Sequence, residues 1–548
     1  MLLLAQLVAP TLQPGPVRLP AVPPADIQPS PFSPISPPTP SPLPPDPPPS
    51  DTTAPAVQGF IPFSSAALAQ ILAGCRALPS PQERLQACAA ALSARLFSDG
   101  YINSRVQIQP DPAPGVLLIK PGRIERIDVV SASAALRQRI SRIIHPLQGQ
   151  VIHLPTLTAN LTQLQRLPGV GRLRTSLNRV ARDSTRGVLL ITVDPASQGL
   201  RGEFSLRNDG NAGSGQFRGL GTLVQSSLLR SGDTLLLFGE VNTDSDPELG
   251  YSSSSLSYSL PIAEPLSFTL ATGLSRRTLV EAEEPLRDLS YRQLQLFGQF
   301  DYTFKESLRD RLSGFVGLSL NRSDAFLAGD RAPVIAGGGD DAWLRSGYVR
   351  FGMGYEMVRQ GFVIETSLYG LQGIGAISTT GQLDELAFLG VVPEDARAIG
   401  AQTSLSWLVV PGWLLNLRVA GQGAFEPLTN AMGFSLGSDN GLRGLPGQAI
   451  SGDSGVLGSA ELAWSFWSRP SDSLQLVPFL GAGKVWTEVP GATLTDSIGA
   501  GGVLLRWSRG RHGELEIGWV RQFQAESRVF WENWILGNGL YSKVVYRF

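Results

Sequence analysis

Between residues 199 and 548, hydrophobic and polar positions alternate along many short runs of the chain. In one of these runs Leu294 and Leu296 fall on one face, while Gln293 and Gln295 fall on the other. Successive side chains of a β-strand point to opposite sides, so this period of two predicts strands with one apolar and one polar face. The apolar face must then lie in an apolar medium.

Segments rich in glycine, serine and aspartate separate these strands, for example residues 244–250 and 329–341. A soluble sandwich would instead have polar outer faces and shorter loops. A closed barrel suits a membrane because it leaves no strand edge unpaired in lipid. Residues 199–548 are therefore predicted to form a transmembrane antiparallel β-barrel. Membrane strands of roughly 9–11 residues would allow about 14 to 18 of them.

Ahead of the barrel, helical spacing of apolar residues alternates with short apolar strands. Residues 57–123 follow the order strand, helix, helix, strand, strand, and residues 124–195 repeat it. Helices are expected at 64–73, 81–97, 134–144 and 154–167. Repetition of one small unit indicates two tandem α+β modules.

The first residues of the chain have little material for a core. Nineteen of the 42 prolines lie between residues 10 and 55, and such a segment prefers an extended conformation. Residues 14–56 are therefore interpreted as a proline-rich linker. Residues 1–13 begin with a short apolar run but lack the positive charge of a secretory signal. They are interpreted as a partial signal peptide, with a disordered apolar tail as the alternative.

Composition narrows the functional classes. The net charge is −1 and the pI is about 6.4, so no nucleic-acid partner is expected. The three histidines are scattered, and neither a metal site nor another cofactor is predicted. The sequence contains no Gly-x-x-x-x-Gly-Lys-Ser/Thr loop and no recognisable catalytic triad, which argues against an enzyme. It also contains no run of 18 apolar residues, which excludes a helical membrane protein.

Cys75 and Cys88 are separated by 13 positions within the first module. In an oxidising periplasm they could form a disulfide, which would stabilise the module by roughly 3 kcal/mol through loop closure. Two buried free thiols are the alternative.

The second module is strongly basic. From residue 120 to residue 192 the chain has twelve lysines and arginines against three acidic residues, a net charge of +9. Solvated arginines on an exposed surface are the simplest explanation. The alternative hypothesis is that Arg174, Arg179 and Arg182 belong to a basic face that steers an acidic client or anionic lipid headgroups.

A glycine-rich stretch between two predicted barrel strands, residues 433–464, carries the most specific motif. It contains, in order, Leu442-Arg443-Gly444-Leu445, Gly452-Asp453-Ser454-Gly455 and Glu461-Leu462. A single arginine between two leucines suggests a loop packed inward, with its guanidinium seeking a buried acceptor. The ordered triple motif resembles the lumen-inserted sixth loop of the two-partner secretion transporters (the TpsB family, of the haemolysin activator and filamentous haemagglutinin transporter type). These transporters belong to the superfamily of outer-membrane insertases and translocases.

The two modules carry a second resemblance. Residues 99–105, Asp-Gly-Tyr-Ile-Asn-Ser-Arg, and residues 164–170, Leu-Gln-Arg-Leu-Pro-Gly-Val, are similar to motifs of polypeptide-transport-associated (POTRA) domains. The resemblance implies one POTRA domain per module, with Tyr101, Ser104 and Arg105 on a client-binding surface. A small sheet covered by helices on one face leaves a strand edge with which an extended client could pair.

One departure from the family pattern concerns the loop arginine. Strands after the family's long loop carry Phe-x-Asp-x-Gly, whose aspartate pairs with that arginine. The corresponding residues here are Phe479, Gly481 and Gly483, so the aspartate is missing. A buried, unpaired guanidinium would cost several kcal/mol. Arg443 is therefore expected to find a substitute acceptor, such as backbone carbonyls.

The C-terminus places Tyr546 and Phe548 on one strand face and resembles the signal read by the barrel-assembly machinery. The whole resemblance implies a barrel of about sixteen strands in the outer-membrane lipid. Such a barrel would move a secreted exoprotein client (TpsA-like, of haemolysin or adhesin type) from the periplasm to the cell surface without ATP. The POTRA domains would capture the client, and Arg443 and Asp453 would set the conformation of the loop. An outer-membrane insertase and a passive porin are the alternatives.

Overall fold

A computed structural model describes residues 55–548 except residues 112–114, 166, 168, 181–182, 196–198, 231, 246–247, 283–286, 360 and 524–530. The predicted signal peptide and almost all of the predicted linker therefore lie outside the described residues. The chain divides near residue 197 into two compact units, and each unit has its own sheets and core.

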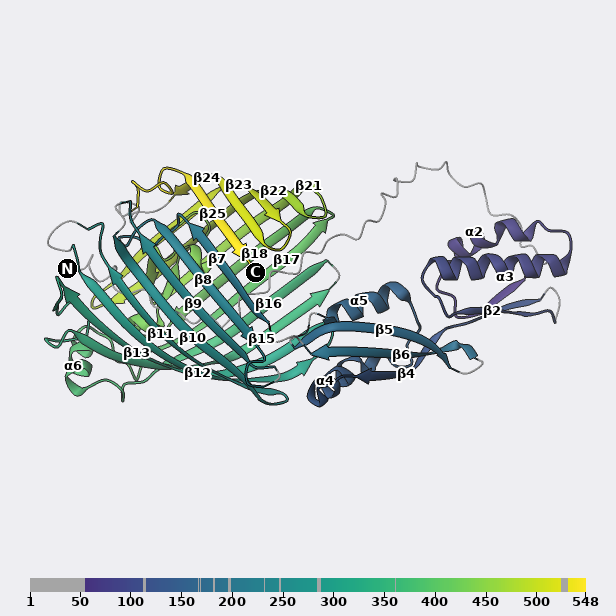
Figure 1. The fold of residues 1–548 in the computed structure, drawn as a ribbon, viewed down its shortest axis with the longest axis horizontal. Helices are drawn as coiled ribbons and strands as arrows, with labels where there is room; N and C mark the ends of the chain where they lie inside the picture. The colour runs from purple at the N-terminus through teal and green to yellow at the C-terminus, as the bar shows by residue number, and fades with distance from the viewer. Residues whose placement is uncertain are drawn as a thin grey trace. The chain divides into compact units, whose positions relative to one another are not determined.

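The N-terminal unit begins with an α+β module whose two helices lie against a three-stranded sheet (Figure 1). Its elements are β1 (Ala56–Gly59), α2 (Ser65–Arg76), α3 (Pro81–Ser98), β2 (Arg105–Gln109) and β3 (Val116–Lys120). The side chains of Ser64 and Ser80 cap the two helices by accepting a hydrogen bond from the N–H three residues ahead. Leu72, Leu92 and Leu117 are buried between the helices and the sheet.

The second module repeats this plan. Its elements are β4 (Arg123–Val130), α4 (Ala134–Ile144), the 3₁₀ turn η1 (His145–Leu147), α5 (Leu154–Gln165), β5 (Val170–Val180) and β6 (Asp183–Pro195). The sheet order β4-β6-β5 matches the order β1-β3-β2 of the first module, with one parallel and one antiparallel pair in each. Both modules therefore have the element order predicted from sequence. None of the helices in the described residues is both long and apolar enough to span a membrane.

A disulfide joins the two helices of the first module. Cys75 lies in the last turn of α2 and Cys88 in the middle of α3, with Cα atoms 5.2 Å apart. Cys88 is fully buried and Cys75 is nearly so. The bond therefore fixes the helix pair within the hydrophobic core of the module.

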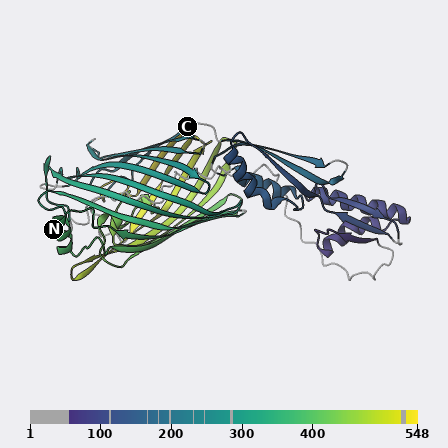
Figure 2. The same cartoon turned by 90° about the horizontal axis from the view of Figure 1, so that it is seen from below.

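Sixteen long strands form a closed barrel in the C-terminal unit (Figures 1 and 2). Neighbouring strands are antiparallel throughout, and the last strand pairs with the first. The two-residue strand β14 (Asp330–Arg331) folds back and pairs antiparallel with the end of β13. The sixteen strands are β7 (Leu200–Arg207), β8 (Phe217–Ser226), β9 (Thr234–Thr243), β10 (Leu249–Ala263), β11 (Leu266–Thr278), β12 (Ser290–Glu306), β13 (Asp310–Leu327), β15 (Trp343–Arg359), β16 (Phe362–Gly373), β17 (Arg397–Val410), β18 (Trp413–Ala424), β21 (Ser454–Ser468), β22 (Asp472–Val489), β23 (Ala492–Arg509), β24 (Gly513–Phe523) and β25 (Leu540–Arg547).

Side chains on the barrel strands alternate between the outer face and the lumen. On β12, Leu294 and Leu296 are exposed on the outside, whereas Gln299 is buried on the inside. An apolar outer band with a polar interior is the arrangement of a membrane barrel. The predicted fold class, α+β modules followed by an antiparallel barrel of about sixteen strands, is therefore confirmed.

The connections between barrel strands differ at the two ends of the barrel. One end has short turns, such as residues 264–265 and 411–412, and the other has long connections, such as residues 374–396 and 425–453. The helix α6 (Thr380–Phe388) lies in one of the long connections. Bacterial outer-membrane barrels have short turns on the periplasmic side and longer loops at the cell surface. The long connections therefore mark the extracellular end.

Breaking the disulfide should destabilise the first module by about 3 kcal/mol, because the bond closes a loop of this size in the unfolded chain. Pulse proteolysis of the full chain in urea, with and without a reductant, measures this change at residues 65–98. The same comparison at the second module, which contains no cysteine, is the control. Equal proteolysis of the first module in both states would contradict the expectation.

Candidate functional site in the barrel lumen

The connection between β18 and β21, residues 425–453, folds into the barrel. It contains η2 (Asn430–Met432), the hairpin strands β19 (Phe434–Leu436) and β20 (Ile450–Gly452), and η3 (Ser438–Asn440). Leu436, Leu442 and Leu445 pack against the inner wall formed by β21 to β24 in one hydrophobic cluster. The sequence predicted the loop at residues 433–464. Strand β21 begins at Ser454, so residues 454–464 belong to the barrel wall. The name lumen loop is used below for residues 425–453.

The tip of the lumen loop is built around Arg443. Leu442 and Leu445 on either side are fully buried, which holds the arginine between them inside the barrel. Gly444 has a φ of +83°, and a Cβ there would lie 2.5 Å from a methyl carbon of Val520. A residue with a side chain would therefore be strained at this position and would collide with the inner wall.

Two glutamates accept hydrogen bonds from the guanidinium of Arg443. Its Nε donates to Glu461 Oε1 at 2.7 Å, and its Nη1 donates to Glu516 Oε2 at 2.6 Å. Glu461 lies on β21 and Glu516 on β24, and the side chain of Glu516 is 0% exposed. Arg506 on β23 donates to the other oxygen of Glu516, also at 2.6 Å. These charge-assisted hydrogen bonds join the loop tip to three strands of the wall.

Arg443 therefore has a substitute acceptor, as expected, but two carboxylates fill this role and not the backbone carbonyls given as an example. Gly481 on β22 faces the loop, and a Cβ there would lie 3.0 Å from a methyl carbon of Leu442. The family pattern has an aspartate at this position. Here the side chain of Leu442 packs against the wall in its place. Glu461 belonged to the sequence motif, but the role of Glu516 was missed. The sequence feature that could have indicated this role was the position of Glu516 on the polar face of β24.

A second ion pair holds the lumen loop on another side of the barrel. Arg218 on β8 is buried, and its Nη1 donates to Asp439 Oδ1 of the loop at 2.6 Å. Its Nη2 donates to Glu240 Oε2 on the neighbouring strand β9 at 2.9 Å. Gly447 lies so close that a Cβ would be 2.7 Å from Arg218 Nη1. Glycine is needed at this position because the loop passes so close to Arg218. Its φ is not in the left-handed region.

These two groups of ion pairs are called the Arg443 anchor (Arg443 with Glu461 and Glu516) and the Asp439 anchor (Asp439 with Arg218). In the closed sheet, β24 and β8 are separated by β25 and β7. Residues 439–443 of the loop therefore tie together strands on both sides of the β25–β7 pair, where the first and last strands of the barrel meet.

The Gly-Asp-Ser-Gly part of the motif fixes the base of the loop rather than its tip. Asp453 accepts hydrogen bonds from the backbone N–H of Leu428 at 3.1 Å and of Glu488 at 2.8 Å. A Cβ on Gly452 would lie 2.7 Å from the Trp486 carbonyl oxygen, and one on Gly455 would lie 2.3 Å from the Phe434 ring. These three motif residues therefore allow the loop to leave and re-enter the wall in close contact with it.

The remaining motif residues of β22 line the inner wall under the loop. Phe479 is buried, and its ring approaches the position of a Cβ on Gly444 to 3.4 Å. A Cβ on Gly483 would lie 2.7 Å from a methyl carbon of Leu436. Both residues therefore shape the wall for the loop leucines.

The connection between β24 and β25 adds to the filling of the lumen. Trp531 is buried and donates to Gln522 Oε1 at 2.9 Å. Gln522 in turn donates from Nε2 to the Gly444 carbonyl oxygen at 2.8 Å. The tip of the lumen loop is thus held by backbone as well as by side-chain contacts.

The POTRA-type motif residues lie where the two modules meet. The ring of Tyr101 lies 4.8 Å from that of His153 in the second module. Ser104 is buried, and its hydroxyl oxygen accepts a hydrogen bond from the Gly122 N–H at 3.0 Å. Arg105 donates to two backbone carbonyl oxygens of its own turn. In this conformation Tyr101 contacts the second module, whereas Ser104 and Arg105 stabilise the turn and strand end of the first.

The basic residues of the second module include two exposed arginines on β5, Arg174 and Arg179. Strand β5 forms one edge of the sheet, so its outer side is open to pairing. Arg174 makes an exposed ion pair with Asp194 at 3.3 Å. Arg182 lies outside the described residues.

The C-terminal aromatic residues lie on the outer face of the barrel. Tyr546 and Phe548 are both exposed, and the Phe548 ring stacks on that of Phe204 at 6.0 Å. They therefore cover the junction between the last strand and the first.

Comparison with protein families identifies this architecture. The family model of the haemolysin secretion/activation protein ShlB/FhaC/HecB matches residues 187–504, which is more than half of the chain. The chain belongs to the ShlB/FhaC/HecB family. It is a two-partner secretion transporter of the outer membrane, and its partner is an exoprotein. No curated protein sequence matches the chain.

Solved structures agree on the fold of this ShlB/FhaC/HecB family member. CdiB from Escherichia coli is 17% identical, with 90% of each chain covered and a TM-score of 0.57. CdiB from Acinetobacter baumannii is also 17% identical, with 90% of this chain and 89% of the other covered and a TM-score of 0.52. At this identity the likeness shows a shared fold.

Replacement of the buried acid should loosen the tip of the lumen loop in this family member. Glu516→Gln leaves Arg443 and Arg506 with one carboxylate between them, which should cost about 3 kcal/mol, near the lower end for breaking a buried ion pair. Hydrogen exchange at residues 438–447 should accelerate by roughly two orders of magnitude. Glu514→Gln is the control on the same strand: Glu514 pairs with Lys543 and Arg547 and forms no ion pair with Arg443, although Lys543 also contacts Glu516. Unchanged exchange in Glu516→Gln would contradict the role assigned to this anchor.

Proposed function

We propose that the exoprotein client is captured in an unfolded state by the two N-terminal modules and passes through the barrel lumen, while the lumen loop controls passage. The observation that supports this most is the pair of anchors, which hold an inserted loop against separate parts of the wall. A loop held in this way obstructs the lumen, and breaking the anchors would release it.

Capture is assigned to the edge of the second module. Strand β5 is an edge strand, and an extended client can add to such an edge through backbone hydrogen bonds. The exposed Arg174 and Arg179 lie on the same strand and would steer an acidic client segment to that edge. Main-chain pairing would provide the contact, and the charges would raise the rate of encounter.

Passage requires the lumen loop to move. Its leucines, together with Trp531, Trp534 and Leu536 of the β24–β25 connection, form a buried cluster inside the barrel. A polypeptide crossing the lumen would have to displace part of this cluster and break at least one anchor. The chain has no recognisable nucleotide-binding loop, so folding of the client outside the cell would supply the free energy.

The other predicted partners belong to the same proposal. The apolar outer face would contact outer-membrane lipid, and Tyr546 and Phe548 would be recognised by the barrel-assembly machinery during biogenesis. An insertase or a passive porin is the alternative function for this architecture. Neither alternative would bring the exoprotein into the medium.

Secretion of the large exoprotein encoded beside this gene tests the proposal. In a Gram-negative host the exoprotein should appear in the medium only when this chain is co-expressed. Arg443→Ala should reduce secretion to a small fraction, because the two glutamates then lose their partner in the loop. Arg397→Ala, at an exposed arginine on the outer face of β17, should leave secretion unchanged. A client that stays in the periplasm while the barrel is correctly assembled would overturn the proposal in favour of the alternatives.

Charge reversal tests the capture step separately. The double variant Arg174→Glu/Arg179→Glu should slow association of the client, and the defect should shrink as salt rises from about 0.05 M to about 0.5 M. The module should remain folded, because an exposed ion pair such as Arg174–Asp194 contributes at most about 1 kcal/mol. Arg126→Glu is the matched control, since Arg126 pairs with Asp128 on the opposite edge strand β4. Equal association rates for all three proteins would remove the basic face from the mechanism.

A further inference from the structure

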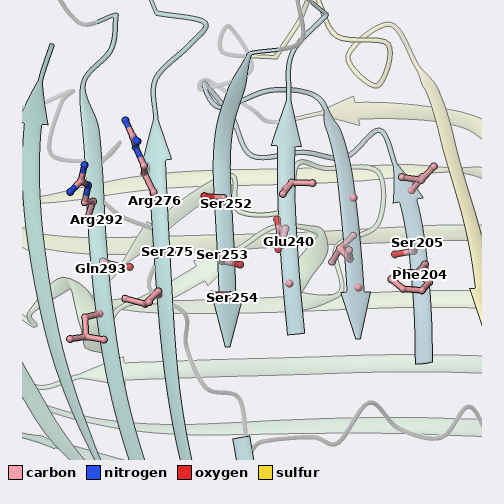
Figure 3. A pocket seen from close by; sticks show the side chains of 18 of the residues that line it. Phe204, Ser205, Glu240, Ser252, Ser253, Ser254, Ser275, Arg276, Arg292 and Gln293 are labelled. Carbon is pink, nitrogen blue, oxygen red and sulfur yellow. The ribbon is translucent and has the colours of Figure 1, made fainter. Parts of the chain in front are cut away.

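A groove of about 1030 Å³ lies across the outer face of strands β25 and β7 to β13. Most of the residues that line it occupy outward-facing positions of these strands. Figure 3 shows labelled residues of β7 and β9 to β12 side by side across this part of the sheet. The groove is therefore a feature of the lipid-facing surface and is separate from the lumen loop.

The strand register explains why the outer face is hollow here. One row of cross-strand partners runs through Phe204, Gly221, Gly239, Ser254 and Leu274. Three small residues thus form the floor between an aromatic and an aliphatic wall. A Cβ added to Gly239 would meet only one atom within 4 Å, a carbonyl oxygen at 3.9 Å. The space above the floor is therefore open.

The walls on both sides are apolar and exposed. Tyr546 on β25 is the register partner of Phe204, and Leu294 on β12 is the register partner of Leu274. All four side chains are exposed on the outer face. A channel of this kind, with apolar walls and a floor without large side chains, suits a hydrocarbon chain lying along the barrel.

The row of residues next to this one carries positive charge. Arg276 on β11 and Arg292 on β12 are direct cross-strand partners, and both are exposed. Figure 3 shows the two guanidinium groups at the same end of their strands. Arg292 also lies over the Phe326 ring, 4.6 Å from its centroid, which fixes its direction. Like charges directly opposite each other destabilise a sheet. Asp324 on β13 is the register partner of Arg292 on its other side, but both oxygens of Asp324 accept hydrogen bonds from Arg322.

The neighbouring strand adds a balanced pair. Arg322 on β13 lies beside the groove and forms an ion pair with Asp324 at 3.0 Å. Within the part of the chain that the structure describes, Arg276 and Arg292 form no ion pair with an acidic side chain. The three arginines and one aspartate at this end of the groove therefore give its outer face a net charge of +2.

This end of the groove faces the cell surface. Arg276 is the third residue from the end of β11 and Arg292 the third residue of β12, beside the long connection between these strands. The long connections mark the extracellular end of the barrel. The arginines therefore lie at the headgroup level of the outer leaflet, and the apolar floor extends from them towards the bilayer centre.

We propose that this groove binds a phosphate-bearing lipid of the leaflet that faces the cell surface. An acyl chain would lie on Gly221, Gly239 and Ser254, and a headgroup phosphate would bridge Arg276 and Arg292. Arginine suits this role because its planar guanidinium can form two parallel hydrogen bonds to one phosphate. The proposal rests on the outer-membrane lipid contact proposed above and identifies its site and ligand class.

Native mass spectrometry of the full-length protein in a non-ionic detergent tests the proposal, with diphosphorylated lipid A as the probe. Wild-type protein should retain this lipid and bind its dephosphorylated form much more weakly. Arg276→Gln/Arg292→Gln should weaken binding roughly 30-fold, because each arginine near an anionic headgroup contributes about a factor of five. Gly239→Leu keeps both arginines but fills the floor, and it should also reduce binding. Heat-dependent migration on gels verifies that each variant barrel is folded.

Arg397→Gln is the matched control, since Arg397 is an exposed arginine near the long-connection end of β17 and does not line the groove. It should bind the lipid as the wild type does. Equal binding by wild type and the double variant, equal binding of the dephosphorylated lipid, or an equal loss in Arg397→Gln would overturn the proposal. Secretion of the client does not enter this measurement, so its failure leaves the transport function untouched.

Discussion

A strand inside a bilayer meets no water that could satisfy its backbone N–H and C=O groups, so the ladder of hydrogen bonds has to close on itself. Pairing of β25 with β7 provides this closure. It also fixes which residues face the lumen, because side chains alternate strictly along each strand. Glu461, Arg506 and Glu516 then lie on the inner wall, away from lipid and partly away from water. Their charges require partners inside the barrel, and Arg443 of the lumen loop is one of them.

The lumen loop is therefore part of the electrostatics of the wall as well as an obstacle in the pore. Asp439 and Arg443 are only four positions apart, yet they reach β8 and β24 on opposite sides of the strand pair that closes the barrel. A loop that binds both sides braces this pair from within. On the outside, Phe204 and Phe548 stack across the same two strands. Opening of the lumen and stability of the wall are thus coupled through a few side chains.

Much of this architecture could be predicted from the sequence. The period of two along 199–548 gave the barrel, and the repeated element order of residues 57–195 gave the modules. The motif around Arg443 predicted a buried loop, and Gly481 correctly indicated that the expected aspartate partner was missing. The identity of the actual partners could not be predicted in the same way. Alternation places Glu516 on the inner face of β24, but only strand register and barrel curvature bring it to Arg443, and neither is local in sequence.

The closing strand pair has a further consequence for how the chain folds. Strands β7 and β25 pair through Glu203–Arg207 and Lys543–Arg547, whereas β22 and β23 pair over residues 472–489. The shortest of these ladders therefore joins residues more than three hundred positions apart, with the largest loss of chain entropy to overcome. Until the final strand has arrived, every partly formed sheet has two open edges that can pair with other chains. The barrel can therefore close only when the whole polypeptide is present. The strand synthesised last covers the open edge of the strand synthesised first.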